Sequence, residues 1–268
     1  YTTKSKILYT YENSGKGKLQ KAEDQEVTYL DMNGTSSKFT GSVTVGEDIF
    51  GNKYETQVTT TYTLVGGQVK PDITTTTTTS QAIDDSVSIT KTSLQYNYEQ
   101  RTINGKTATV LVSVTPVEVT ATLDTKSYTG TGVVTVGKDA FGNYYHSVVT
   151  NTYLIATDDN NKTYLINGAP KVKTSTTTTT TEPGWMIDGS SYTTISKILY
   201  TYENSGKGKL QKAEDQLVTY TDMDGKSATF TGSATVGEDI FGNKYETQVT
   251  ATYTLVGGQV KPDITTTT

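Results

Sequence analysis

The stretch GEDIFGNKYETQVT at residues 46–59 holds side chains that could bind a cation. Glu47, Asp48 and Asn52 could supply oxygen ligands, and the two glycines would allow the tight backbone of an ion-binding loop. Calcium takes about six to eight oxygen ligands, usually including several carboxylates at close spacing. This chemistry makes Asp48, and its counterparts Asp139 and Asp239 in two later copies of the stretch, candidate calcium ligands.

Comparison of the three copies favours a structural turn over an ion site. Residues 237–250 repeat the stretch letter for letter, but the looser copy at 137–150 has Lys138 in place of the glutamate, which would put a cation beside the ion. Glycine and asparagine tolerate positive φ, as a hairpin connection requires. We therefore predict a turn in which the aspartate binds backbone amides and Phe50 folds back over the end of the core. The turn residues are Gly51 and Asn52, Gly142 and Asn143, and Gly242 and Asn243.

The other residue types argue against catalysis. The chain has no cysteine and one histidine, His146, whose counterparts in the other copies are Glu55 and Glu246. A Cys/His pair is therefore excluded, and a Ser-His-Asp site has little support. The acidic residues gather in segments that we interpret as exposed loops, which disfavours a carboxylate pair for glycoside hydrolysis. We predict that the protein is not an enzyme and has no catalytic residues, with His146 on a strand surface.

The composition indicates the elements that position these residues. Threonine makes up about a fifth of the chain, and tyrosine occurs 19 times. β-Branched and aromatic residues fit a pleated, half-buried surface, so we expect β-structure with thin cores. The net charge is −5 with both signs mixed, which argues against nucleic acid as a partner, because binding its backbone normally needs a concentrated basic face. No run approaches the roughly 18 apolar residues that span a bilayer, so we expect no membrane insertion within this segment.

Internal repeats define the organisation. Residues 1–77 recur at residues 192–268 with nine differences, and a divergent third copy lies between them. A period of about 90 residues suits a small β-sandwich and is too long for a solenoid rung. We predict repeat 1 over residues 1–79, a divergent repeat 2 over 80–181, a linker over 182–191 and repeat 3 over 192–268. Tyr1 is not an initiator methionine, so we expect an excerpt from a longer array.

Within each copy the residue pattern alternates with a period of two. Ile7, Tyr9 and Tyr11 fall on one face of a strand, while Thr10 and Glu12 fall on the other. The following DMNG sequence at 31–34 is an Asx-Gly turn signal. Helical periodicity is nearly absent. The sequence therefore predicts an all-β fold made of tandem sandwich modules.

Threonine runs at residues 74–79, 176–181 and 265–268 punctuate the copies. We expect each run to be the last strand of a module that continues into a stiff connector, because β-branched residues prefer extended backbone. A flexible linker and an O-glycosylated connector are the alternatives. An ice-binding surface is disfavoured, because it needs many regular ranks of threonine and short runs do not supply them.

Two further features concern carbohydrate. Asn33 and Asn161 each begin an N-x-S/T sequon, which makes them candidate glycosylation sites in surface loops. Tyr144, Tyr145 and Trp185 could stack on sugar rings, which would suit a carbohydrate-binding module array. Alternate tyrosines in a strand are more often core residues, so we place this function behind a structural one.

Near-identical β-modules, threonine-rich junctions and the lack of cysteine together resemble the immunoglobulin-like repeat regions of prokaryotic surface proteins, namely adhesin stalks and filament subunits. The resemblance implies immunoglobulin-like sandwiches in an extended array, an extracellular location at the cell surface and a role as a structural or adhesive spacer. It implies self-association or a cell-surface or matrix partner, and no cofactor unless calcium stiffens the junctions. The alternative is a homopolymeric filament whose chains join by β-strand addition.

Overall fold

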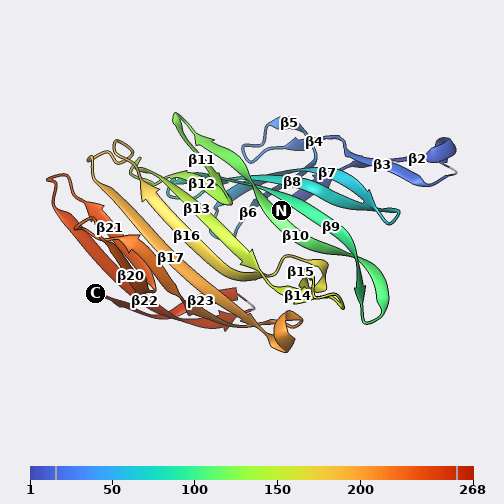
Figure 1. Cartoon of the computed structure of the whole chain (residues 1–268). Coiled ribbons are helices and arrows are strands. Elements are labelled where there is room, and N and C mark those ends of the chain that lie inside the picture. Colours follow the sequence, from blue (N-terminus) through green and yellow to red (C-terminus); the bar gives the residue numbers. More distant parts are fainter. Residues whose placement is uncertain (16, 258) are drawn as a thin grey trace. The chain divides into compact units, whose positions relative to one another are not determined.

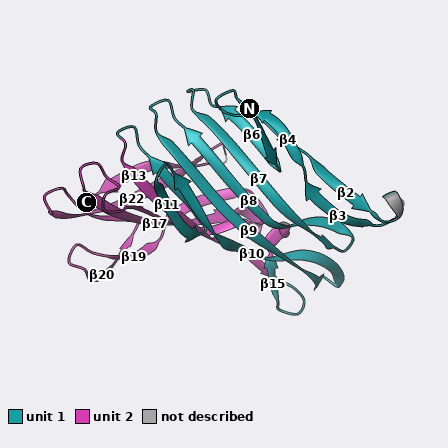
Figure 2. Ribbon diagram, turned by 90° about the horizontal axis from the view of Figure 1, so that it is seen from above, with its two compact units in different colours: residues 1–141, 157–164 teal, residues 142–156, 165–268 magenta. Residues whose placement is uncertain are grey.

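The computed structural model describes residues 1–15, 17–257 and 259–268, whose regular secondary structure is almost entirely β-strand (Figure 1). The chain forms two compact units (Figure 2). Unit 1 contains residues 1–141 and 157–164, and unit 2 contains residues 142–156 and 165–268. None of the helical segments in the described part of the chain has the length and apolar character needed to span a membrane.

Unit 1 is built on one antiparallel main sheet in the order β1-β6-β7-β8-β9-β12. The second half of β9 pairs with β10, and β10 continues into a hairpin with β11. Two further hairpins, β2–β3 and β4–β5, complete the unit. The strands are β1 (Thr2–Ser5), β2 (Ile7–Tyr11), β3 (Leu19–Asp24), β4 (Glu26–Leu30), β5 (Ser36–Thr40), β6 (Ser42–Glu47), β7 (Lys53–Val65), β8 (Gln68–Gln81), β9 (Val87–Ile103), β10 (Lys106–Leu123), β11 (Lys126–Thr131) and β12 (Val133–Lys138).

Unit 2 repeats this plan in the order β13-β16-β17-β21-β22-β23, with β18 paired to the second half of β17 and a β19–β20 hairpin. Its strands are β13 (Tyr144–Tyr153), β16 (Val172–Thr181), β17 (Ser191–Tyr202), β18 (Leu210–Asp215), β19 (Leu217–Thr221), β20 (Ser227–Thr231), β21 (Ser233–Glu238), β22 (Lys244–Val256) and β23 (Gln259–Thr267). The remaining elements are the short strands β14 (Ile155–Thr157) and β15 (Thr163–Leu165) and the 3-10 turns Glu12–Gly15, Ile166–Gly168 and Glu203–Gly206.

The all-β prediction is confirmed, whereas immunoglobulin-like sandwiches are not. The described strands of each unit form one main sheet with small hairpins beside it, rather than two sheets of similar size. The sequence division into three repeats remains a prediction, and the middle repeat contributes strands to both units.

The thin cores lie where a hairpin covers the main sheet. In unit 1, Tyr29 of the β4–β5 hairpin and Val43 of β6 are both buried, and the β10–β11 hairpin buries Ala121. In unit 2, Val218 of the β19–β20 hairpin and Ala234 of β21 are buried in the same way. Small and β-branched residues dominate these cores, because a single hairpin leaves little depth for larger ones.

Two of the three threonine runs lie in central strands, so the predicted stiff connector is wrong for them, whereas the third run begins in β23, which pairs with β22. Residues 74–79 lie within β8, which pairs with β7 along one edge and with β9 along the other. Residues 176–181 lie within β16, which pairs with β13 and β17. The segments after these strands, 82–86 and 182–190, are turns that lead directly into the next strand. Threonine suits such strands because its branched Cβ favours extended backbone and its hydroxyl can bond across the sheet.

Threonines that lie directly opposite one another on neighbouring strands form regular ranks, which are rows of side chains that cross the sheet. This differs from the expectation that short threonine runs would not supply such ranks. In unit 1 one rank crosses six strands through Thr3, Thr44, Thr56, Thr78, Thr90 and Thr135. Hydroxyl groups bond at alternate steps of this rank, at 2.9 Å between Thr3 and Thr44, 3.0 Å between Thr56 and Thr78, and 2.9 Å between Thr90 and Thr135. The alternation follows from antiparallel pairing, in which side chains approach more closely at the pairs that lack backbone hydrogen bonds.

Candidate functional site

The recurring GEDIFGN stretch forms the turn between β6 and β7, and again between β21 and β22. Oδ1 of Asp48 accepts the backbone N–H groups of Phe50 at 2.8 Å and of Asn52 at 3.0 Å, and Nδ2 of Asn52 donates to Oδ2 at 2.8 Å. Gly51 has a φ of 89°, which only glycine adopts easily. Asp239, Phe241 and Asn243 repeat the same bonds.

These hydrogen bonds give the aspartate a structural role in the turn that needs no bound ion. Donation by Asn52 and by backbone amides lowers the pKa of Asp48, and donation by Asn243 lowers the pKa of Asp239. In the middle copy, Asp139 accepts the N–H of Phe141 in the same way. Within the described ranges no group of three or more acidic or histidine side chains could hold a metal ion. The carboxylates of Asp48 and Asp239 are therefore used by hydrogen bonds within their own turns.

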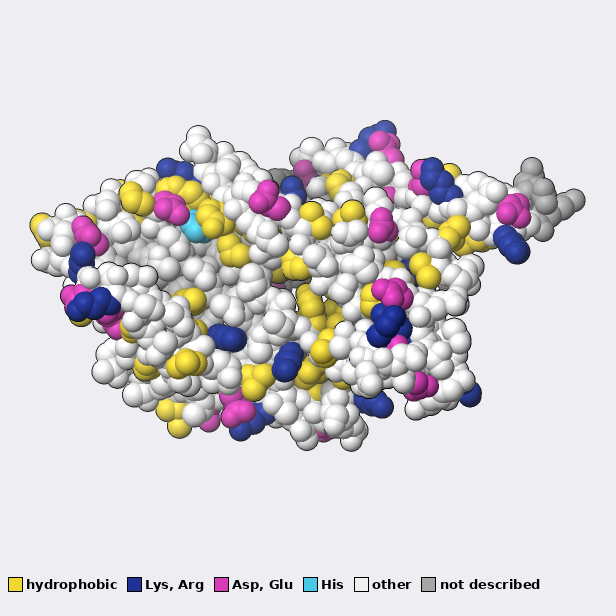
Figure 3. Space-filling view, in the orientation of Figure 1, with side chains coloured by type: hydrophobic (Ala, Val, Ile, Leu, Met, Phe, Trp, Pro, Cys, Tyr) yellow, Lys and Arg dark blue, Asp and Glu magenta, His cyan; other side chains and the backbone are white. Residues whose placement is uncertain are grey.

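The aromatic residue of each turn points outward, so the prediction that Phe50 folds over the core is wrong. Phe50 is 71% exposed, Phe141 83% and Phe241 81%. In unit 1, Ile49 and Ile83 are also exposed, and Asn52 joins their two turns by accepting the N–H of Ile83 at 3.0 Å. Ile49, Phe50 and Ile83 are therefore exposed apolar side chains carried by two turns that are joined to each other. In Figure 3 the hydrophobic side chains on the drawn face lie in several separate groups.

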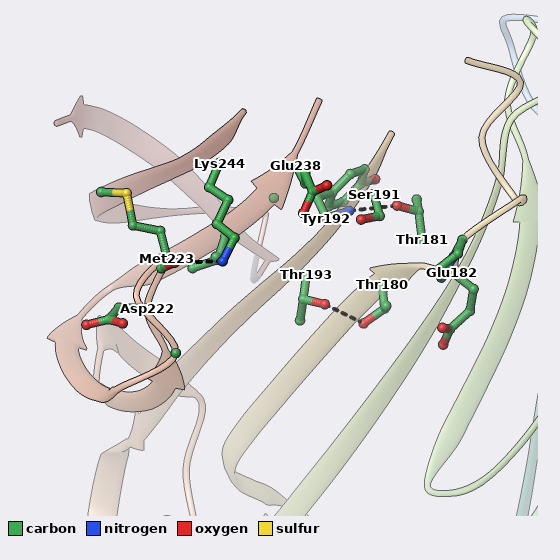
Figure 4. Close-up of a pocket in the computed structure, with 14 residues that line it drawn as sticks. Thr180, Thr181, Glu182, Ser191, Tyr192, Thr193, Asp222, Met223, Glu238 and Lys244 are labelled. Carbon is green, nitrogen blue, oxygen red and sulfur yellow. Dashed lines mark hydrogen bonds between the residues drawn. The ribbon is translucent and has the colours of Figure 1, made fainter. Parts of the chain in front are cut away.

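A groove beneath the hairpin recurs in the two near-identical copies. In unit 1 it has a volume of about 650 Å³ and lies between the β4–β5 turn and the sheet, with Tyr1, Met32 and Val45 among its lining residues. In unit 2 a groove of about 340 Å³ has Tyr192, Met223 and Val236 at the same places (Figure 4). Lys244 lies at its rim and donates to the carbonyl oxygen of Met223 at 3.3 Å.

A cluster of polar side chains next to this groove joins the β4–β5 hairpin to the main sheet through hydrogen bonds. The hydroxyl of Tyr29 donates to Glu55 at 2.7 Å and accepts from Nε2 of Gln57 at 3.0 Å. Burial, together with the bond to Glu55, raises the pKa of Tyr29. Tyr220, Glu246 and Gln248 repeat the arrangement in unit 2. Since each hydroxyl is bonded to two side chains, the arrangement holds the β4–β5 and β19–β20 hairpins in place.

His146 is buried, at 4% exposure, so its predicted place on a strand surface is wrong. Its Nε2 lies 2.8 Å from a carboxylate oxygen of Glu182, and its ring packs edge-on at 5.5 Å from Trp185. Trp185 also packs against Tyr144, with ring centroids 6.4 Å apart. The sequence placed Trp185 alone in a linker, and no spacing signal could have joined it to His146, because the two residues meet only when β13 and β16 pair. Trp185 is thus engaged within the chain, which weakens the sugar-stacking hypothesis that included Tyr145.

The candidate glycosylation residues both lie in exposed turns of unit 1. Asn33 is in the turn of the β4–β5 hairpin, where its N–H donates to Asp31 at 2.9 Å. Asn161 is in the 158–162 turn and has a φ of 59°. Their modification remains a prediction.

Comparison of this chain with protein-family models, with curated proteins and with solved structures finds no match.

Proposed function

We propose that this chain is a structural and adhesive repeat region of an extracellular surface protein or filament, in which the repeats act as a modular spacer. The work of such a region is to extend and to present surfaces rather than to turn over a substrate. The resemblance to surface-protein repeat regions suggests the location, and the repeated strand pairing supports the structural role.

The observation that carries the proposal is the identical strand pairing of the two near-copies. Thr2 lies opposite Val45 in unit 1, as Thr193 lies opposite Val236 in unit 2. The pairs of β6 with β7 and of β21 with β22 also correspond one to one over their whole length. A unit that keeps its register in two surroundings behaves as a building block used in series.

Lengthening the array tests the spacer role. Residues 78–268 can be appended after Thr268, because Thr268 stands where Thr77 stands in the first copy. We expect each added copy to increase the maximum dimension, measured by small-angle X-ray scattering, by the same increment. A compact globule would instead grow as roughly the 0.38 power of chain length. A maximum dimension that increases only on that weaker scale would refute the spacer role.

The exposed turns supply the adhesive part of the proposal. A variant with Phe50→Ser, Phe141→Ser and Phe241→Ser is expected to bind a methyl-terminated monolayer at least about ten-fold more weakly than the unchanged chain, because burying one phenylalanine contributes about 1.5–3 kcal/mol. Binding is measured with a quartz crystal microbalance.

The matched control removes three exposed apolar residues away from these turns, through Leu30→Ser, Ile155→Ser and Leu217→Ser. These side chains are 63%, 58% and 58% exposed. We expect the control to bind as the unchanged chain does. An equal loss in both variants would show that general hydrophobicity, and not the turns, mediates adhesion.

A further inference from the structure

The groove beneath the β19–β20 hairpin of unit 2 extends further under the hairpin than the opening drawn in Figure 4. A second cavity, of about 400 Å³, adjoins the first, and Thr193, Asp222 and Val236 line both of them. Binding sites for small molecules in proteins are usually clefts of about 300–1,000 Å³. The groove is therefore large enough to hold a small molecule.

The strand register shows which side chains form the floor of this groove. Thr180 of β16 lies opposite Thr193 of β17, which in turn lies opposite Val236 of β21, so the three side chains share one face of the sheet. The hydroxyls of Thr180 and Thr193 are bonded to each other at 3.2 Å. Two residues further along the same face, Ile195 lies opposite Ala234, and both line the inner cavity. The floor therefore becomes apolar towards its inner end.

The opening of the groove carries acidic side chains. On the face that forms the floor, the next row across the sheet sets Ser191 opposite Glu238, and Glu238 opposite Lys244. Glu182, which follows β16, and Asp222 of the β19–β20 turn also line the opening (Figure 4). Three carboxylates and one lysine give this lining a net charge of −2. Charge complementarity therefore favours a cationic ligand.

The lysine at the opening does not neutralise these carboxylates. Nζ of Lys244 donates to the carbonyl oxygen of Met223 at 3.3 Å, and none of the three carboxylates pairs with a lysine or arginine of the described residues. Glu182 bonds to His146 through one oxygen, whereas Glu238 has neither a hydrogen bond nor an ion pair within the part of the chain that the structure describes. Glu238 can therefore accept from a ligand without giving up an existing bond.

The near-copy in unit 1 differs at the inner end of its groove. Lys4 stands where unit 2 has Ile195, and its Nζ donates to the carbonyl oxygen of Thr28 at 2.8 Å. A lysine at this position is thus compatible with the fold, but its charge repels a cation and its ammonium group replaces an apolar surface. The groove of unit 2 is therefore the better site for a cation with an apolar body.

We propose that the groove of unit 2 binds a small organic cation, namely a primary ammonium group on a short alkyl chain. The alkyl chain lies on Val236 and Ile195, where it leaves water, and the ammonium group donates to Glu238 at the opening. A neutral head group lacks the charge, and an anionic one is repelled. This proposal goes beyond the spacer role, which stands whether or not the groove binds a ligand, because scattering from the lengthened array measures extension alone.

Isothermal titration calorimetry of the full chain with hexylammonium chloride tests the ligand class. The titration is run at pH 7, where an alkylamine is protonated as lysine is. We expect saturable binding of one molecule per chain, at least about ten-fold tighter than the binding of hexan-1-ol or hexanoate, because charge-assisted hydrogen bonds are the stronger ones. The three probes share the alkyl chain and differ in the head group. Equal affinity for hexan-1-ol, or no saturable binding of hexylammonium, would overturn the proposal.

Two substitutions in unit 2 test the location. Glu238→Gln removes the charge and keeps the shape, so it should weaken hexylammonium binding at least about five-fold. Glu214→Gln is the matched control, because Glu214 pairs with Lys212 at 2.6 Å and does not line the groove, and it should leave the affinity unchanged. Ile195→Lys should abolish binding, and Lys4 of the near-copy shows that the fold accepts this lysine. Equal weakening by the two glutamate variants, or unchanged affinity in Ile195→Lys, would overturn the site.

Discussion

Replacing Gly41 with alanine is expected to destabilise the β4–β5 region by roughly 3–5 kcal/mol. Gly41 joins the hairpin to β6 and has a φ of 137°, which side-chain-bearing residues rarely adopt. An alanine Cβ would also overlap the carbonyl oxygen of Val58 on the neighbouring strand and the ring of Phe39. Backbone cannot move aside as a flexible side chain can, so the hairpin or the sheet must shift. Gly232 repeats the geometry with a φ of 136°.

The measurement is hydrogen exchange by mass spectrometry, with peptides from residues 19–47. The copies differ at several positions in this range, so the peptides of the unchanged third copy serve as an internal standard. Gly34→Ala is the control, because Gly34 also has a positive φ, 78°, but an added Cβ would meet open space. We expect this control to cost only about 1 kcal/mol. Equal losses for the two variants would show that strain at Gly41 does not depend on the close approach to Val58.

Replacing Asp24 with alanine is expected to destabilise unit 1 by about 3 kcal/mol. Asp24 ends β3, and its carboxylate accepts the N–H of Thr60 at 2.7 Å and the hydroxyl of Tyr62 at 2.9 Å on β7. Asp215 makes the same two bonds in unit 2. Both groups on β7 would lose a charged partner and stay partly buried. Urea unfolding should show the loss, and a double-mutant cycle with Tyr62→Phe should give a coupling energy of at least about 1 kcal/mol.

Alkaline pH provides a second readout of the same contact. Burial, with the bond to Asp24, raises the pKa of Tyr62 from its ordinary value of 10.0 to about 12. The unfolded chain therefore loses this proton at lower pH than the folded chain does. The stability that the proton provides is complete below about pH 10 and is lost as pH rises towards about 12. Tyr62→Phe should reduce the loss of stability across this range, and an unchanged slope would contradict the assignment.

Local sequence determined the secondary structure of this protein and the form of its turns. Threonine and tyrosine alternate with the period of a strand, and Gly51 with Asn52 suits the backbone of the turn that the structure shows. Each of these properties depends on neighbours along the chain, so it can be read without knowing the fold. The duplication was likewise visible in the letters alone.

Only the tertiary structure decided which strands are neighbours. The period-two alternation of residues tells which side chains share a face of a strand. It does not tell which part of the chain packs on that face or which strand pairs along its edge. The run at 74–79 therefore looked like the end of a module, although β9 covers its outer edge. Likewise, His146 is buried because Glu182 and Trp185 come from another part of the chain, while Phe50 is exposed because none of the described strands covers it. Pairing and burial are set by contacts between residues distant in sequence, and their partners become known only when the sheet has formed.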